Sequence, residues 1–180
     1  MKGLTLIELM ISIALFIIFM SIGIPGFGDF VDKYKASTST HSLKRILTHS
    51  RIIALEKEMY ITICPIQNNK CSSQWQGIIT TFEDLNNNQQ IDEDEHQFLS
   101  SELHLSHGYW QKKREKKTYI LFNPQGHAFS SATTFLYCPF SKALNHAKLL
   151  VISFQGRIRV DNYMTPHGSI NRRAAPLNCI

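Results

Sequence analysis

A single carboxylate, Glu8, lies inside an otherwise apolar stretch that covers residues 4–24. A helix of this length reaches about 30 Å, which is enough to cross the hydrocarbon core of a bilayer. An acid in such a segment is costly unless a positive group neutralises it, so Glu8 is a functional candidate that requires a partner. We expect that partner to be an amine on another copy of the same segment, and Glu8 then sets the register of assembly.

Three residues, Met1, Lys2 and Gly3, precede the apolar stretch and form a short leader with one positive charge. Cleavage after Gly3 would make Leu4 the new amino terminus. By the positive-inside rule, Lys2 keeps the leader in the cytoplasm and leaves the rest of the chain outside the inner membrane. The alternatives are a secretory signal peptide, which has a shorter apolar core without an acid, and an ordinary single-span anchor, which leaves the acid unexplained.

A second chemical candidate is the run Gly156-Arg157-Ile158-Arg159 near the C-terminal end. In an extended segment alternate side chains point to opposite faces, so Arg157 and Arg159 share one face. The two guanidiniums are then about 7 Å apart, close to the spacing of successive phosphates in a nucleic-acid strand. Gly156 allows the backbone to turn beside them. The alternative is a solvated pair of strand arginines near Asp161.

Two further basic groups extend the candidate surface. Arg172 and Arg173 lie in a C-terminal tail rich in Pro, Gly and Asn, and Lys112 and Lys113 lie in a lysine-rich run that follows Trp110. An aromatic ring there could stack on an unpaired base while the lysines follow the backbone; a solvated loop is the alternative. Contacts to phosphate are independent of sequence and sensitive to salt, so a nucleic acid bound by this surface would not be recognised by its sequence.

Residues 84–95 form an acidic and amide-rich stretch. They place oxygen-bearing side chains at the first, third, fifth, ninth and twelfth positions of an EF-hand-like calcium loop. The glycine usual at the sixth position is Gln89, and no helix clearly precedes the loop. Calcium is therefore an alternative only, and we expect neither a bound metal nor a cofactor.

The four cysteines, Cys64, Cys71, Cys138 and Cys179, all follow the apolar stretch. The compartment outside the inner membrane is oxidising, so disulfides are expected, and three pairings are open. We favour Cys64 with Cys71, which closes a short loop, and Cys138 with Cys179, which ties the tail to the body. A zinc site is the alternative, but the chain has no C-x-x-C pair.

The formal net charge of +5 conceals a strong segregation of charge. Residues 83–102 contain seven acids and no Lys or Arg, whereas residues 103–180 contain eleven Lys or Arg and two acids. This pattern points to an anionic partner for the C-terminal half. The chain has no G-x-S-x-G, P-loop or Rossmann motif, so we do not expect an enzyme.

These groups must be positioned by a long helix and a set of short strands. Beyond Pro25 and Gly26, where the helix should bend without necessarily ending, an amphipathic half covers residues 25–58. Its packing face is expected at Leu43, Ile46, Leu47, Ser50, Ile53 and Ala54. Residues 59–180 form one globular part, with β-branched and aromatic strands expected at 59–63, 77–82, 118–122, 133–137 and 148–154. No crossover helices intervene, so the fold class is α+β, with the helix packed on an antiparallel β body.

Residues 3–10, Gly-Leu-Thr-Leu-Ile-Glu-Leu-Met, resemble the prepilin cleavage and methylation motif of type IV pilins and type II secretion pseudopilins. Leu4 departs from this motif, which usually has Phe. Residues 50–54 and 61–64 are similar to the helix end and first strand of the FimT/GspH subfamily of minor pilins and minor pseudopilins. The run Gly156-Arg157-Ile158-Arg159 resembles the G-R-x-R motif of FimT-type minor pilins.

The resemblance implies that a prepilin peptidase cuts after Gly3, that Leu4 is methylated, and that Glu8 pairs with the methylated terminus of a neighbouring pilin subunit. It also implies that Gly156, Arg157 and Arg159 bind DNA during uptake, in competence and natural transformation. The precursor would be a single-pass inner-membrane protein with a periplasmic globular domain, extracellular once it is in a pilus. A minor pseudopilin of a type II secretion system is the alternative, and a periplasmic enzyme on a single-span anchor is the third.

Overall fold

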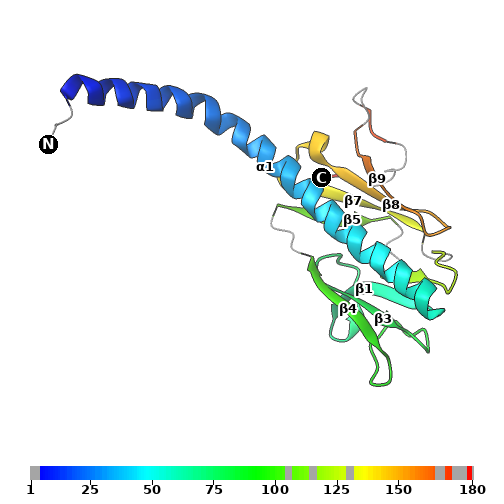
Figure 1. Ribbon diagram of the computed structural model, residues 1–180. Coiled ribbons are helices and arrows are strands. Elements are labelled where there is room, and N and C mark those ends of the chain that lie inside the picture. Colours follow the sequence, from blue (N-terminus) through cyan, green and yellow to red (C-terminus); the bar gives the residue numbers. More distant parts are fainter. Residues whose placement is uncertain are drawn as a thin grey trace.

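The computed structural model describes residues 5–103, 107–113, 117–128, 132–164, 169–171 and 178–179, with the side chains of residues 22–26 left out. One long helix is followed by two antiparallel sheets, which lie against the C-terminal half of that helix (Figure 1). The predicted α+β class, with a long N-terminal helix packed on an antiparallel body, is confirmed.

The helix α1 runs from Leu6 to Lys57. Thr5 caps it, because the Thr5 hydroxyl accepts a hydrogen bond of 3.3 Å from the Glu8 backbone N–H. Glu58 ends it in the left-handed conformation, with φ of 54°. The helix continues through residues 25–26, and Figure 1 shows it as a curved rod.

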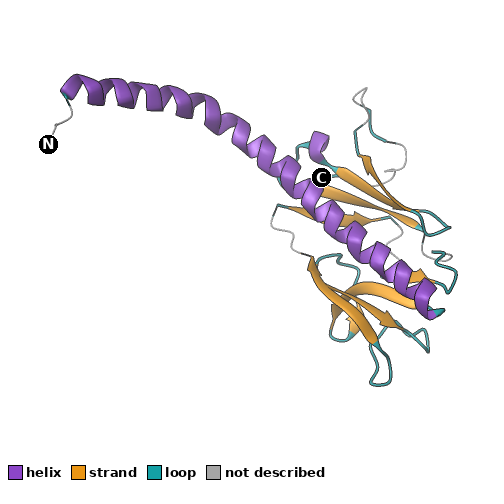
Figure 2. Ribbon diagram, in the orientation of Figure 1, coloured by secondary structure: helices purple, strands orange, loops and turns teal. Residues whose placement is uncertain are grey.

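The two halves of α1 differ in their surroundings. The predicted packing face is buried at all six positions: Leu43, Ile46, Leu47, Ser50, Ile53 and Ala54. Residues 5–21 are exposed, and this half projects away from the sheets (Figure 2). The helical spacing therefore predicted correctly which face would contact the body.

Within the described residues, no helix combines the length and the apolar composition needed to cross a membrane. The transmembrane segment expected at residues 4–24 is therefore not confirmed. Leu4 and the side chains of residues 22–24 lie outside the described part, as does the leader at residues 1–3.

Two sheets make up the body. The first has the order β2-β1-β3-β4, with β6 also pairing with β1, and the second has the order β5-β7-β8-β9. All strand pairs are antiparallel, and β9 is an edge strand. The bounds are β1 Ile61–Gln67, β2 Lys70–Cys71, β3 Gly77–Glu83, β4 Gln97–Leu103, β5 Gly108–Lys112, β6 Ile120–Phe122, β7 Thr133–Pro139, β8 Lys148–Ile152 and β9 Ile158–Asn162, with the short helix η1 (Leu144–His146) before β8.

All five expected strands are present, although β1 and β6 begin two residues later than expected and β8 ends two residues earlier. The strands β2, β4 and β5 were not among those expected, and β9 corresponds to the extended segment expected around Arg157 and Arg159. The alternation in β4 is broken by polar residues, since its sequence is QFLSSEL, and β5 runs directly into the lysine-rich segment. The local composition of β4 and β5 therefore gave no strand signal. Pairing with β3 and β7, respectively, stabilises them.

One buried cluster joins α1 to both sheets, since it contains Leu47 of α1, Ile63 of β1 and Phe135 of β7. A polar contact also lies in this cluster: the hydroxyls of Ser50 on α1 and Thr81 on β3 are hydrogen-bonded to each other, 2.7 Å apart. The two sheets are therefore packed on the same stretch of helix.

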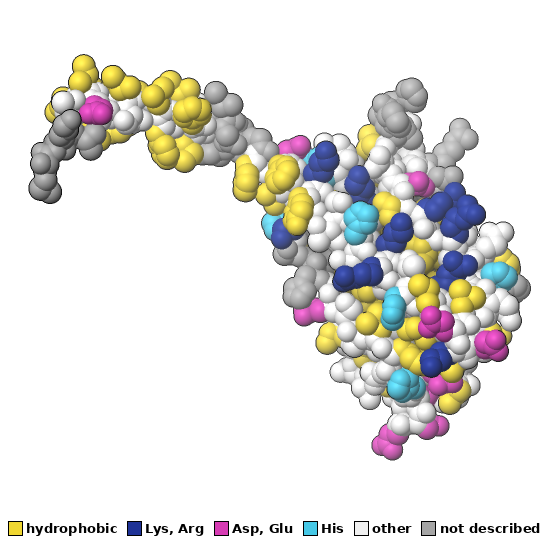
Figure 3. Space-filling model, in the orientation of Figure 1, with side chains coloured by type: hydrophobic (Ala, Val, Ile, Leu, Met, Phe, Trp, Pro, Cys, Tyr) yellow, Lys and Arg dark blue, Asp and Glu magenta, His cyan; other side chains and the backbone are white. Residues whose placement is uncertain are grey.

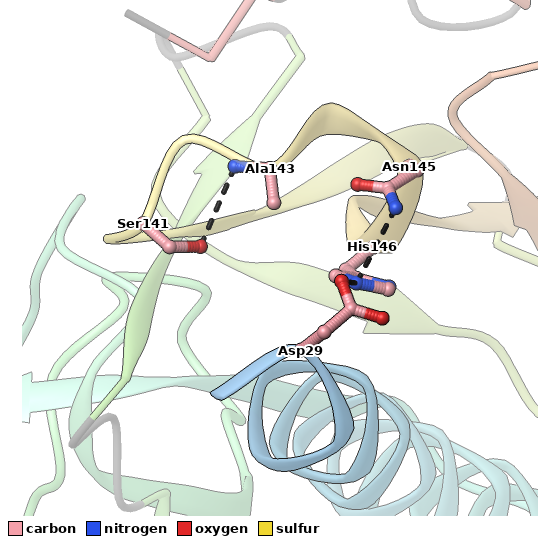
Figure 4. Close-up of polar contacts among 5 residues, drawn as sticks. All are labelled: Asp29, Ser141, Ala143, Asn145 and His146. Carbon is pink, nitrogen blue, oxygen red and sulfur yellow. Dashed lines mark hydrogen bonds and ion pairs between the residues drawn. The ribbon is translucent and has the colours of Figure 1, made fainter. Parts of the chain in front are cut away.

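A polar contact joins η1 to α1 close to the border between the two halves of the helix (Figure 4). The His146 Nε2 lies 2.6 Å from Asp29 Oδ1, and His146 is buried while Asp29 is exposed. The neighbouring turn is closed by the Ala143 N–H, which donates to the Ser141 hydroxyl over 3.4 Å. This contact fixes the second sheet to the helix.

The structure contains disulfides between Cys64 and Cys71 and between Cys138 and Cys179, which is the pairing favoured from the sequence. The first joins β1 to β2. The second ties the last described residues to β7. Nearby in the chain, the hydroxyl of Tyr163, which follows β9, donates to Asn178 Oδ1 over 3.4 Å. Burial raises the pKa of Tyr163.

Candidate functional site

The predicted arginine pair is positioned by the turn between β8 and β9. The Gly156 N–H donates to the Ser153 carbonyl over 2.9 Å, and the Ser153 N–H donates to the Arg157 carbonyl over 3.0 Å. The Ser153 hydroxyl also accepts a bond of 3.1 Å from the Arg157 N–H. The turn is thus closed by its own backbone before the arginine side chains begin.

Arg51 of α1 joins this turn to a second one at residues 123–127. Its Nε donates to the Gly126 carbonyl over 2.8 Å, and its Nη2 lies 3.3 Å from the Gln155 carbonyl. Arg51 is half-buried, and its guanidinium links the end of the helix to both turns. It acts as a positioning residue for the β8–β9 turn.

Gly156 is required by close approach as well as by its backbone conformation. Its φ is +73°, and a Cβ at this position would lie 2.0 Å from the Gly126 carbonyl oxygen and 2.8 Å from Arg51 Nε. No side chain fits at these distances. The sequence predicted only that Gly156 allows the backbone to turn. The structure shows that the missing side chain also lets the two turns pack together.

Arg157 and Arg159 are exposed, whereas Ile158 and Val160 are half-buried and Ile158 packs against the core, as the alternation predicts. Among the described residues, neither guanidinium forms an ion pair. An open hollow of about 590 Å³ is lined by Arg51, Ser153, Gln155, Arg157 and Arg159. We call this the arginine hollow.

Figure 3 shows how charge is distributed over one face of the body. Lys and Arg side chains gather over its upper and middle parts, along α1 and towards β8 and β9, and Asp and Glu are more frequent towards the end that carries β3 and β4. Basic and acidic side chains are therefore concentrated on different parts of this face. The arginine hollow is formed by residues of α1, of the β8–β9 turn and of β9.

Lys112 does not belong to this surface, because it is buried at 6% exposure. Its ammonium donates to the Lys117 carbonyl and, over 3.2 Å, to the Tyr119 carbonyl, and lies 5.9 Å from the centre of the Trp75 ring. Burial, helped by the charge of Lys117, lowers the pKa of Lys112 to about 8. The expected DNA contact of Lys112 is therefore corrected: packing beside Trp75 removes its ammonium from the surface.

Trp110 is likewise buried, at 7% exposure, and its indole N–H donates to the Ser39 hydroxyl over 3.2 Å. It cannot offer its ring to a base. Lys113 is half-buried and stays a prediction. Arg172 and Arg173 lie outside the described residues.

The acidic turn at residues 84–95 uses its carboxylates to hold itself together. Asp84 accepts bonds from the Asn88 and Gln89 N–H groups, at 3.0 and 3.2 Å, and Glu95 accepts from the Leu85 and Asp92 N–H groups, at 2.9 and 3.2 Å. In the described part of the chain, no three His, Cys, Asp or Glu residues are grouped so as to hold a metal ion. The oxygen spacing of a calcium loop here serves an internal hydrogen-bond network.

Glu8 is exposed in the first turn of α1, where Thr5 caps the helix. A carboxylate at a helix N-terminus is favourable because it faces the positive end of the helix dipole. This local role was not foreseen from the sequence, although the spacing Thr5 to Glu8 is that of a capping box. Gly3 and Leu4 lie outside the described residues, so the role of Glu8 in assembly stays a prediction.

Sequence reasoning missed Arg51 as a member of the site and Phe154 as a residue of the adjoining turn. The partners of Arg51 are 75 and 104 positions away in the chain, so no local pattern could have identified them. Phe154 was expected at the end of a strand but lies in the β8–β9 turn, where 47% of its surface is exposed. An aromatic residue directly before a Gln-Gly turn was the available signal.

The fold and sequence have known relatives. The family described as type II transport protein GspH matches residues 39–156, which is well over half of the chain. Two crystal structures of the type IV minor pilin FimU of Pseudomonas aeruginosa strain PAO1 are similar to this chain, each at 16% identity and each covered over 98% of its own length. Their TM-scores are 0.57 and 0.53, over 80% and 76% of this chain. No curated protein matches the sequence.

At 16% identity the likeness to FimU shows the fold alone. The family match covers α1 from residue 39 to its end and the strands from β1 to β8. The chain therefore belongs to the GspH/FimT family of minor pilins and pseudopilins, which are structural proteins and not enzymes.

Proposed function

We propose that this protein is a minor pilin of a type IV pilus that binds extracellular DNA, without sequence preference, during DNA uptake in natural transformation. The observation that carries the proposal is the arginine hollow. Two exposed guanidiniums, those of Arg157 and Arg159, line it together with Arg51, and neither has an ion-pair partner among the described residues. Unneutralised guanidiniums at strand spacing are suited to adjacent phosphates.

In the mechanism we propose, one pair of residues positions the β8–β9 turn and another pair binds the DNA. Arg51 holds the two turns, and Gly156 allows them to approach, so Arg157 and Arg159 extend from a fixed edge of the second sheet. Binding then displaces counterions from the DNA backbone and reads no base edges. Lys113, Arg172 and Arg173 are proposed to extend the same basic surface.

Assembly is proposed to depend on the exposed half of α1. We propose that a prepilin peptidase cuts after Gly3, that Leu4 is methylated, and that Glu8 pairs with the terminal ammonium of a neighbouring subunit. Residues 5–21 expose a row of large apolar side chains, which favours an apolar environment. We propose that the inner membrane supplies it in the precursor, with the body in the periplasm, and that other pilin subunits supply it in the pilus.

The DNA proposal is tested with the full-length chain in a non-ionic detergent and fluorescently labelled duplex DNA. We expect binding at low salt that weakens as salt rises. The double variant Arg157→Gln with Arg159→Gln should lose affinity about tenfold or more, and the slope of log affinity against log salt should fall by about 2, because two phosphate contacts are lost.

A matched control removes the same charge elsewhere. Lys33 on α1 and Lys70 on β2 are both exposed, and Lys33→Gln with Lys70→Gln should change affinity less than twofold. An equal loss in both double variants would show that only net charge matters. Absence of duplex binding by the wild-type chain at low salt would contradict the proposal outright.

The assembly proposal is tested by intact mass and by incorporation into fibres. Purified mature protein should lack Met1, Lys2 and Gly3 and carry one methyl group. Glu8→Gln keeps the length of the side chain and removes its charge, so it should prevent incorporation, whereas Glu56→Gln at the far end of α1 should not. Normal fibres with Glu8→Gln would contradict the assembly role and leave Glu8 only its favourable position at the positive end of the helix dipole.

A minor pseudopilin of a type II secretion system is the second candidate, and the description of the matching family, type II transport protein, favours it. In that role the body would contact other pseudopilins or exported proteins. The two candidates separate in the DNA experiment, because a pseudopilin requires no affinity for DNA.

A further inference from the structure

An aromatic side chain lies in the same turn as the arginine pair. Phe154 exposes 47% of its surface, and the residues on either side of it, Ser153 and Gln155, line the arginine hollow. The turn is otherwise polar. Because about half of this side chain lies at the surface, part of its apolar area can still be removed from water by a ligand.

The ring is held in place by the second turn. The His127 and Phe154 rings are stacked, with their centres 6.4 Å apart and 27° between their planes. The Ala128 N–H donates to the Phe154 carbonyl over 3.0 Å, and the Asn123 side chain accepts a 2.8 Å bond from the His127 N–H. With Arg51 bonded to both turns, little conformational freedom remains to be lost on binding.

The aromatic and the cationic groups complement one another. Proteins that bind unpaired nucleic-acid strands combine a cationic groove with exposed aromatic rings. The rings stack on the bases, and the cations contact the phosphates. A base inside a closed duplex has both faces covered by its neighbours. The expected aromatic partner of the lysine-rich run, Trp110, is buried and cannot take this part.

We infer that the β8–β9 turn binds an unstacked nucleobase, with Phe154 stacked on the base and Arg157 and Arg159 on the flanking phosphates. The inference rests on the proposed DNA binding and specifies which DNA is preferred. Every base has a stacking face, so the preference is for strand state and not for sequence. An unstacked base is present along a single strand and at the frayed end of a linear duplex.

The test compares four labelled DNAs of equal phosphate number, bound to the full-length chain in detergent: a mixed-sequence single strand, the same strand with abasic sites, a blunt linear duplex and a covalently closed duplex circle. We expect the single strand to bind about tenfold more tightly than the closed circle, with the linear duplex between them. The abasic strand should bind no more tightly than the closed circle.

Three substitutions at Phe154 and one elsewhere separate stacking from folding. Phe154→Leu keeps an apolar side chain without an aromatic face, and it should lower single-strand affinity about tenfold while leaving closed-circle affinity within twofold. Phe154→Ala should do the same, and Phe154→Trp should retain the preference. Phe140→Leu, at an exposed aromatic ring stacked on Tyr109, should change neither affinity.

The outcomes distinguish the two proposals. If closed-circle DNA binds through Arg157 and Arg159 but Phe154→Leu affects all four DNAs equally, the stacking inference is wrong and the proposed DNA binding stands. If the wild-type chain shows no preference for the single strand over the abasic strand, the inference is also wrong. If no DNA binds at low salt, both fail together.

Discussion

The body of this protein carries two charged turns, and they use their charge in opposite ways. In the acidic turn at residues 84–95, Asp84 and Glu95 accept hydrogen bonds from the backbone of the turn itself. In the β8–β9 turn the backbone closes without the arginines, so Arg157 and Arg159 are left exposed. The acidic turn is a closed network, and the basic turn presents charge to the surroundings.

The difference shows why a run of charges in a sequence does not by itself indicate a binding site. A charged side chain whose hydrogen bonds are satisfied within the protein stabilises the fold, and its removal leaves buried partners unsatisfied. A charged side chain without an internal partner contributes little to stability and is available for a ligand. Substitutions should therefore separate stability from binding in the two turns.

The largest effect is expected at Gly156, on which the packing of the basic turn depends. Gly156→Ala places a Cβ 2.0 Å from the Gly126 carbonyl oxygen in a left-handed conformation, and should lower the free energy of unfolding by about 3 kcal/mol. Gly77 has the same sign of φ, +76°, but open space around its Cβ position, so Gly77→Ala should cost only about 1 kcal/mol. Denaturant unfolding of both variants measures the difference, and equal losses would show that the close approach is unimportant.

An intermediate effect is expected in the acidic turn. Asp84 is buried at 5% exposure, and Asp84→Ala leaves the N–H groups of Asn88 and Gln89 without their acceptor. The free energy of unfolding should fall by about 2 kcal/mol, while DNA affinity should change less than twofold. Asp94 is exposed, and Asp94→Ala removes the same charge with little loss of stability. A comparable loss in both variants would contradict the closed network.

The smallest effect concerns Lys112, a basic residue that behaves like neither turn because it is buried. Its pKa of about 8 lies below its ordinary value of 10.5, so between these values the unfolded chain binds more protons and stability rises with pH. From pH 9 to 10 the unfolding free energy of the wild type should rise by about 1 kcal/mol relative to Lys112→Met.

Tyrosines limit this pH window. Burial raises the pKa of Tyr137 to about 12, with Asp32 adding to the effect, and burial also raises that of Tyr163. Both therefore reduce stability above pH 10, in the wild type and in the variant alike. Parallel curves for wild type and variant between pH 9 and 10 would show that Lys112 is not the group responsible.

Much of the fold could be predicted because its signals are local. The packed face of α1 follows from the spacing of Leu43, Ile46 and Leu47, and β7 follows from its β-branched and aromatic residues. The pairing of Cys138 with Cys179 was favoured for a general reason, the low apolar content of the tail. In each case the side chains and their spacing in the chain contain the information.

The site could be predicted only in part. The alternation around Arg157 and Arg159 is a local property of extended backbone, and the prediction of their common exposed face was correct. The burial of Lys112 and Trp110 was not predictable, because it results from their packing beside Trp75, Tyr119 and Ser39, which lie elsewhere in the chain.

By itself, the sequence determined the long helix, the antiparallel character of the body, the separation of acidic from basic residues and the exposure of the arginine pair. These depend on side-chain type and on the periods of helix and strand, which act over a few residues. Only the tertiary structure decided that Arg51 and Gly156 join two distant turns, that Lys112 is inside, and that Phe154 lies beside the arginines. Those relations arise when segments far apart in the chain pack together, and contacts of that kind have no local signature.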